Sequence, residues 1–155
     1  MYNTAMPRNL EADVALLHIA AGGLRNTPPP GALAQVPPRR PARGRGDDLY
    51  FVVLVTGPGQ PVTSSLLDQL ARQAASVFYA TPGPITTAMR EAASEVNEHL
   101  VSLARSSGDE IDGCLMQGVL RGSDLYLAQS GSGQVLVVRR GQVTRLSTAE
   151  ADRKP

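Results

Sequence analysis

The spacing of hydrophobic and polar positions along the chain predicts an antiparallel sheet and two long helices. The run Leu49–Val55 is apolar throughout and rich in β-branched and aromatic residues, which predicts a strand buried on both faces. The run Val14–Ala21 predicts a shorter buried strand. Between them, residues 22–48 are crowded with proline and glycine, which disfavour helices and inner strands, so we expect a long loop there.

Two helices are predicted in the middle of the chain. Apolar residues recur at intervals of three and four within Val62–Tyr79, and Thr63 or Ser64 can cap this helix. A second helix is predicted from about Ile85 to Ala104. Its inner stripe is expected to be Met89, Ala92, Ala93, Val96, Leu100, Val101 and Leu103.

A run of short strands is predicted after the helices. These strands are Cys114–Leu120, Asp124–Gln129, Gln134–Arg139 and Gln142–Leu146. Glycine-containing turns join them as hairpins. Strands, two helices and then hairpins do not form a βαβ alternation. The order therefore predicts an α/β protein of the α+β type, in which a two-helix hairpin packs on one face of an antiparallel sheet.

Composition narrows the possible partners and compartments. The chain has 155 residues, which suits a single domain over 1–155, with a polar tail at 148–155. The net charge is +1 and aromatic residues make up 4%, so we expect no nucleic-acid partner. No signal peptide or long apolar span is recognisable, so we expect a cytoplasmic protein with no membrane partner.

Several motifs from Asp47 onward occur in a recognisable order. Asp47 and Asp48 precede the main apolar strand, and Asn97 lies in the second helix. The segment Leu120–Ser147 combines a hairpin, a glycine-rich turn and a further strand. These features resemble the metal-dependent protein serine/threonine phosphatases, the PPM or type 2C family, over about two thirds of the chain. The resemblance implies part of that family's layered sandwich.

The same resemblance implies that catalysis has been lost. The family's chemistry needs a cluster of carboxylates that holds two divalent metal ions. Val55 and Ser132 stand where the family has two metal-binding aspartates. Asp47 and Asp48 remain, but neighbouring residues of a strand point to opposite faces. Two later family aspartates lie beyond the matched segment, and this sequence ends at Pro155. We therefore expect no metal cofactor.

The predicted loop at 22–48 is locally basic. The family's phosphate-binding arginine belongs in this region, and Arg40, Arg43 and Arg45 are stand-ins for a weak anion site. A solvated loop is the favoured interpretation, because nothing in the sequence orders these side chains.

Other motifs have plain structural interpretations. The Gly57–Gly59 turn lacks the lysine of a phosphate loop, and the turn around Ser132 lies between strands, not before a helix. His18 and His99 could bind a metal with Asp47, although their spacing is not that of a known site. Cys114, the only cysteine, is expected to be a small buried hydrophobe.

Three functional hypotheses follow. The favoured one is a catalytically inactive PPM-like domain that acts as a protein-interaction, scaffolding or regulatory module. We expect a protein partner or self-association, because strands that are apolar on both faces need cover on two sides. The alternative is an active phosphoprotein phosphatase, completed by a partner chain and using Mg²⁺ or Mn²⁺ at Asp47 and Asp48. The third is a small-ligand or phosphopeptide binder that uses the arginine-rich loop.

Overall fold

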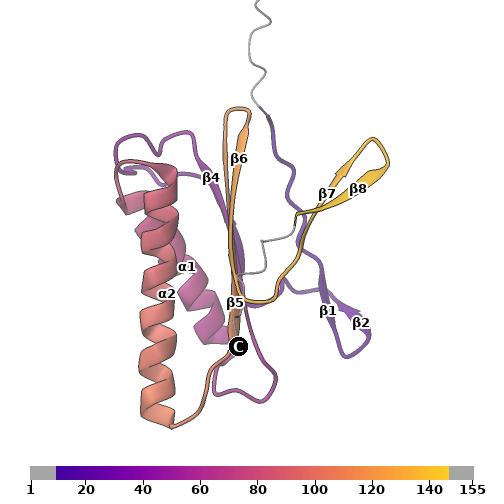
Figure 1. The fold of residues 1–155 in the computed structure, drawn as a ribbon, viewed down its shortest axis with the longest axis vertical. Coiled ribbons are helices and arrows are strands. Elements are labelled where there is room, and N and C mark those ends of the chain that lie inside the picture. Colours follow the sequence, from indigo (N-terminus) through magenta and orange to yellow (C-terminus); the bar gives the residue numbers. More distant parts are fainter. Residues whose placement is uncertain (1–9, 147–155) are drawn as a thin grey trace, which may run out of the picture.

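A four-stranded antiparallel sheet and two helices form the body of the computed structural model, which describes residues 10–146. The strands, in spatial order, are β3 (Ala32–Gln35), β4 (Leu49–Thr56), β5 (Gly113–Arg121) and β6 (Asp124–Ser130). The helices α1 (Ser64–Ala80) and α2 (Ile85–Ser107) lie side by side on one face of this sheet (Figure 1). The predicted fold class is confirmed.

Local signals place the helix ends. The Thr63 hydroxyl accepts a hydrogen bond from the Leu66 amide at 3.1 Å and caps the N-terminus of α1. Gly108 adopts a left-handed conformation and ends α2, so this helix runs one turn beyond the predicted Ala104. Both helices turn small and apolar side chains toward the sheet. The helical part of the core is Leu70, Ala71, Ala74, Ala75, Phe78, Tyr79, Ile85, Ala88, Met89, Ala92 and Val96.

The sheet has one covered face and one face without helices. On β4, Tyr50, Val52 and Leu54 point toward the helices and are buried. The intervening residues belong to the opposite face, where Val55 is 53% exposed. The prediction that Leu49–Val55 is buried on both faces is therefore wrong, because both helices lie on the same side.

The N-terminal region differs from its prediction. Only β1 (His18–Ala20) forms within the predicted strand Val14–Ala21, and it pairs with β2 (Gly23–Arg25) in an exposed hairpin. The expected long loop at 22–48 contains both β2 and β3. Strand β3 forms there because β4, well separated in sequence, supplies its hydrogen-bonding partner.

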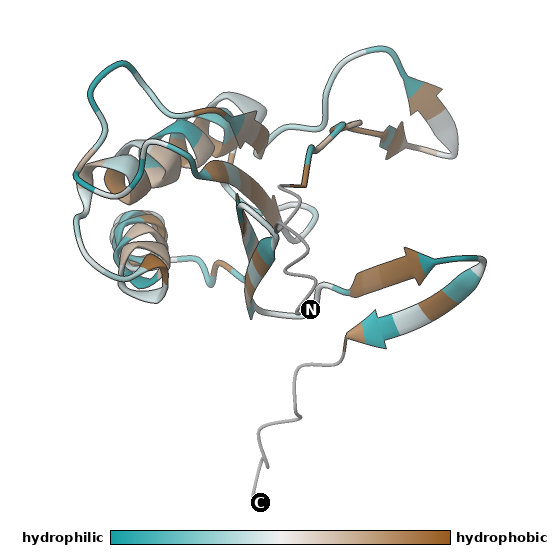
Figure 2. Ribbon diagram, turned by 90° about the horizontal axis from the view of Figure 1, so that it is seen from above, coloured by the Kyte–Doolittle hydropathy of each residue, from teal (hydrophilic) through white to brown (hydrophobic). Residues whose placement is uncertain are grey.

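A second hairpin stands apart near the C-terminal end. Strands β7 (Val135–Arg139) and β8 (Gln142–Leu146) pair only with each other, around a turn at Arg140 and Gly141 where both residues have positive φ. The apolar residues of the predicted strand Gln134–Arg139 lie on both of its alternations, which suits burial on two sides, but four of the five residues of β7 are exposed. Both hairpins lie on the side of the sheet that faces away from the helices (Figure 2).

The predicted polar tail at 148–155 lies outside the described residues. Within residues 10–146, neither helix is long and apolar enough to cross a membrane.

Candidate functional site

The four positions matched to the metal ligands of the PPM family lie at two ends of β4. Asp47 and Asp48 come just before the strand, whereas Val55 is its penultimate residue. Seven residues of extended chain separate Asp48 from Val55, which corresponds to about 23 Å at ~3.3 Å per residue. Asp47 and Asp48 are therefore far from Val55.

Val55 and Ser132 do lie near each other. Cys114 pairs with Val55 across the sheet, and its Sγ accepts a hydrogen bond from the Gly133 amide at 3.2 Å. Gly131 packs closely against the backbone of Cys114. The loop carrying Ser132 is thus held beside the end of β4 at which Val55 lies.

Asp48 is the centre of a buried ion cluster. Its Oδ1 accepts a hydrogen bond from Arg121 Nε at 2.5 Å, and its Oδ2 accepts one from Arg121 Nη2 at 2.7 Å. Arg45 Nη1 lies 3.4 Å from the same Oδ2. Bonding to Asp48 raises the pKa of Arg121. Both carboxylate oxygens are therefore engaged by arginines, whereas the neighbouring Asp47 is exposed.

Arg45 is a structural residue, which corrects its assignment to a solvated loop and a weak anion site. Its side chain is completely buried. The guanidinium donates hydrogen bonds to the carbonyl oxygens of Thr81, Gly83 and Pro84 in the loop between the helices. It also lies 5.1 Å from the centre of the Phe78 ring. These partners leave no exposed donor for an anion, whereas Arg40 and Arg43 are exposed.

Two buried tyrosines connect the sheet to the helices. The Tyr50 hydroxyl donates to Gln117 Oε1 at 2.7 Å, and Gln117 Nε2 donates to the Met89 carbonyl at 3.1 Å. The Tyr79 hydroxyl lies 2.7 Å from the Asp48 carbonyl oxygen. Burial raises the pKa of Tyr79 to about 12, so this phenol stays protonated at neutral pH and serves as a donor.

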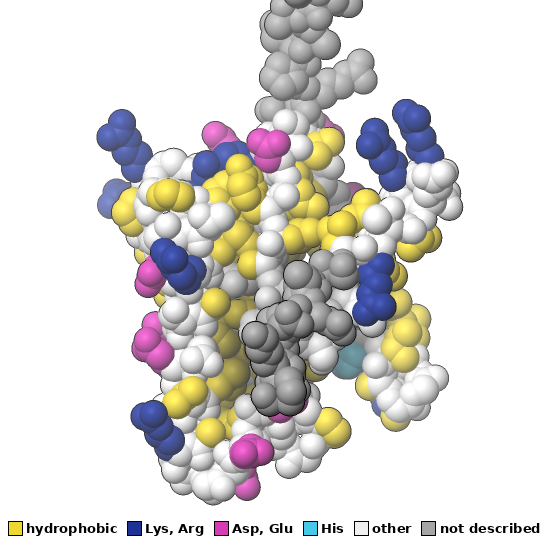
Figure 3. Space-filling view, in the orientation of Figure 1, with side chains coloured by type: hydrophobic (Ala, Val, Ile, Leu, Met, Phe, Trp, Pro, Cys, Tyr) yellow, Lys and Arg dark blue, Asp and Glu magenta, His cyan; other side chains and the backbone are white. Residues whose placement is uncertain are grey.

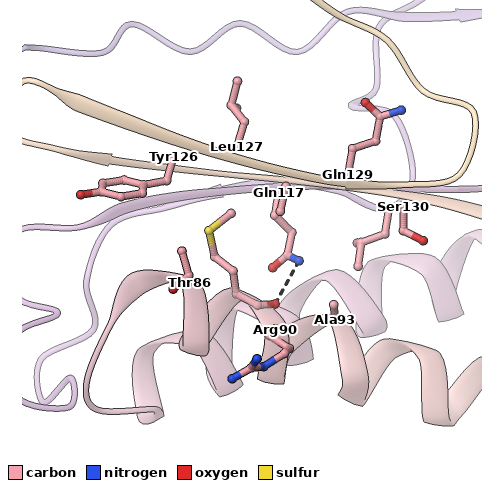
Figure 4. Close-up of a pocket in the computed structure, with 11 residues that line it drawn as sticks. Thr86, Arg90, Ala93, Gln117, Tyr126, Leu127, Gln129 and Ser130 are labelled. Carbon is pink, nitrogen blue, oxygen red and sulfur yellow. Dashed lines mark hydrogen bonds between the residues drawn. The ribbon is translucent and has the colours of Figure 1, made fainter. Parts of the chain in front are cut away.

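A groove separates α2 from the sheet beside β6. It has a volume of about 240 Å³, below the ~300–1,000 Å³ of typical small-ligand pockets. In Figure 4, Thr86, Arg90 and Ala93 come from the helix and Gln117 comes from the sheet. Among the described residues that line the groove there is no carboxylate, histidine or cysteine. The groove therefore offers the hydroxyls of Thr86, Tyr126 and Ser130, but no described carboxylate or imidazole lines it that could activate one of them as a nucleophile.

The sheet face opposite the helices is the larger feature, and we call it the outer face. Cross-strand partners share a face of a sheet, so the register assigns its members. Its apolar residues are Ala32, Ala34, Leu49, Phe51, Val53, Val55, Cys114, Met116, Leu120, Leu125 and Leu127. Leu127 points away from α2 in Figure 4 and is 43% exposed, and Leu125 is 54% exposed. No charged residue of these strands points to this face between its ends.

The other residues considered as metal ligands or reactive groups, His18, His99 and Cys114, lie on different elements of the fold. His99 Nδ1 lies 3.0 Å from the Glu95 carbonyl oxygen within α2, and His18 Nδ1 lies 3.2 Å from the Thr27 carbonyl oxygen near the β1–β2 hairpin. Cys114 is half-buried and packed, close to its expected role. Over residues 10–146, no three histidine, cysteine or acidic side chains are grouped as metal ligands.

Sequence reasoning missed the partners of Asp48. Arg121 falls just outside the predicted strand Cys114–Leu120, although it is the last residue of β5 and pairs with Asp124. The only available signal was an arginine next to Gly122 at a predicted strand end, which does not identify a partner 73 residues away. Tyr50, Tyr79 and Gln117 were also not distinguished from ordinary core positions.

Comparisons of the chain with protein-family models, with curated proteins and with solved structures find no match. The resemblance to the PPM phosphatases therefore rests on the motifs of the sequence.

Proposed function

We propose that this chain is a catalytically inactive, PPM-like protein-interaction module that binds its partner through the outer face of the sheet. The observation that carries the proposal is an apolar sheet face with no helix over it, on which Val55, Leu125 and Leu127 are substantially exposed. Soluble proteins rarely leave a contiguous apolar surface of this kind in water unless it binds something. The exposed hairpin β7–β8 beside this face adds further apolar side chains, as Figure 3 shows in yellow.

Loss of catalysis is proposed from the residues at the matched positions. Val55 cannot bind a metal, and Ser132 lacks the charge of a carboxylate. Asp48 is occupied by two arginines. A phosphatase completed by a partner chain would have to break this buried ion cluster in order to use Asp48 as a ligand.

Cross-linking from the outer face tests the interaction. A photoreactive amino acid replacing Leu125 is expected to give a discrete covalent adduct with another polypeptide in cells, because this side chain faces the proposed partner. The same amino acid replacing Arg72, an exposed residue of α1, is the matched control and should give no such adduct. Equal cross-linking from both positions, or none from Leu125, would contradict the proposal.

Restoring the two missing acids tests the loss of catalysis. Val55→Asp combined with Ser132→Asp is expected to produce no Mn²⁺-dependent hydrolysis of an aryl phosphate, since Asp47 and Asp48 lie at the other end of β4. The double variant should stay within about 1 kcal/mol of wild type in urea unfolding, because both positions are exposed. Metal-dependent turnover by the double variant would show that the inactive assignment is wrong.

A further inference from the structure

We infer that the partner of the outer face is a second copy of this chain, related by a two-fold axis and held in register by the β7–β8 hairpin. This inference rests on the proposed function and names its partner. Three observations support it. The β7–β8 hairpin is apolar and isolated, two segments of the chain have opposite charge, and the outer face with the hairpins offers an area comparable to that of a stable interface.

The β7–β8 hairpin needs cover that its own chain does not supply. Its apolar residues include Leu136, Val138 and Val143, and Val138 is 68% exposed. The two strands contact each other and pack against no other strand or helix among the described residues. A two-stranded hairpin is marginally stable in water on its own. A second sheet packed against it would bury these side chains.

Two segments of the chain have complementary charge. The tip of the hairpin carries Arg139 and Arg140, and residues 125–146 include no acid. The loop between α2 and β5 carries Asp109, Glu110 and Asp112, all exposed, and residues 106–113 include no lysine or arginine. Opposite charges on two patches direct docking and oppose incorrect registers.

The positions of these segments favour a two-fold arrangement. The hairpin tip points toward one end of the long axis, and the α2–β5 loop lies at the other end (Figure 1). Within one chain the two segments are therefore apart. In an antiparallel dimer, the tip of each copy lies level with the acidic loop of the other, so the same contact forms twice. Such self-complementary pairing is the property of an isologous interface.

An interface of stable size needs both the outer face and the hairpins. Four strands spaced ~4.8 Å apart and ~23 Å long present roughly 440 Å². A standard interface buries about 800 Å² on each partner, so the sheet face alone is too small. The β1–β2 and β7–β8 hairpins lie on the same side. At the same spacing, their strands of three, three, five and five residues add roughly 250 Å². The total of roughly 700 Å² per partner falls within the ~600–1,000 Å² per partner of standard-size interfaces.

A charge-swap experiment tests the inference by sedimentation equilibrium up to about 100 μM protein. The wild-type chain should form a dimer, and added salt should weaken it. Arg139→Glu with Arg140→Glu should raise the dimer dissociation constant at least about 100-fold, and so should Asp109→Lys with Glu110→Lys. An equimolar mixture of the two variants should form a heterodimer, because each tip then meets a loop of opposite charge.

A matched control separates this effect from a general change of net charge. Arg40→Glu with Arg43→Glu alters the charge equally on exposed residues of the β3–β4 loop, and it should leave the dimer unchanged. A monomeric wild-type chain, or a mixture that fails to re-form the dimer, would overturn the inference. If the chain is monomeric while Leu125 still cross-links to a different protein, the proposed function stands and only the second copy is excluded. If Leu125 gives no adduct, the proposed function itself falls.

Discussion

Replacing Asp48 with alanine is expected to reduce the free energy of unfolding by about 3–5 kcal/mol, because it leaves a buried arginine without its counter-charge. Arg45 is completely buried and lies 3.4 Å from the Asp48 carboxylate. Arg121 would lose both of its side-chain bonds to Asp48 as well. A loss of this size is a large fraction of the ~5–15 kcal/mol that stabilises a typical domain. Urea unfolding followed by far-UV circular dichroism measures it.

The neighbouring acid provides the control for this variant. Asp47→Ala removes the same charge from an exposed position and should change stability by less than about 0.5 kcal/mol. If Asp48→Ala unfolds the chain at 25 °C, both variants can be compared in sucrose, which raises the stability of the folded state. Similar losses for the two variants would show that the cluster contributes little to folding.

Replacing Phe78 with alanine is also expected to cost about 3–5 kcal/mol, because a fully buried aromatic ring leaves a cavity. The ring stacks on Tyr50 with centroids 4.5 Å apart and meets Tyr79 edge-on at 5.1 Å. Arg45 lies over the same ring. The cavity would therefore open at the point where the sheet, α1 and the ion cluster meet.

The other phenylalanine of the chain provides the matched control. Phe51 lies on the outer face of β4 and is only partly buried, so Phe51→Ala should cost less than half as much in the same urea titration. Both measurements need dilute protein, at which the monomer predominates. An equal or larger loss of stability for Phe51→Ala would mean that the outer face is already packed within one chain. That result would count against the proposal that this face binds a partner.

These variants separate two parts of the protein with different roles. Asp48 and Phe78 belong to the covered side, where the helices, the β3–β4 loop and the end of β5 are held together. The outer face and the β7–β8 hairpin contribute little to that core. Mutations on the covered side should lower stability, whereas mutations on the outer face should alter association and leave the fold largely unchanged.

Local sequence determined the helices, the fold class and the two hairpins that follow the helices, β5–β6 and β7–β8. Periodicity of three and four residues identified both helices, the Thr63 cap placed the start of α1, and β8 has its predicted bounds. These features depend on residues within a few positions of each other, so the sequence contains their physical cause. The presence of Val55 and Ser132 at the positions matched by the resemblance was likewise visible without a structure, although the distance of Val55 from Asp47 and Asp48 was not.

Tertiary structure alone decided which faces are covered and which charges are buried. Alternation within β4 distinguishes two faces, but only the common placement of both helices leaves one of them open. A proline-rich segment became β3 because β4 supplied a partner for its backbone. Arg45 is buried because Asp48, the Phe78 ring and three carbonyl oxygens compensate for its lost hydration. Most of these partners are separated from it by more than 30 residues, and the energy of burying a charge depends on neighbours in space.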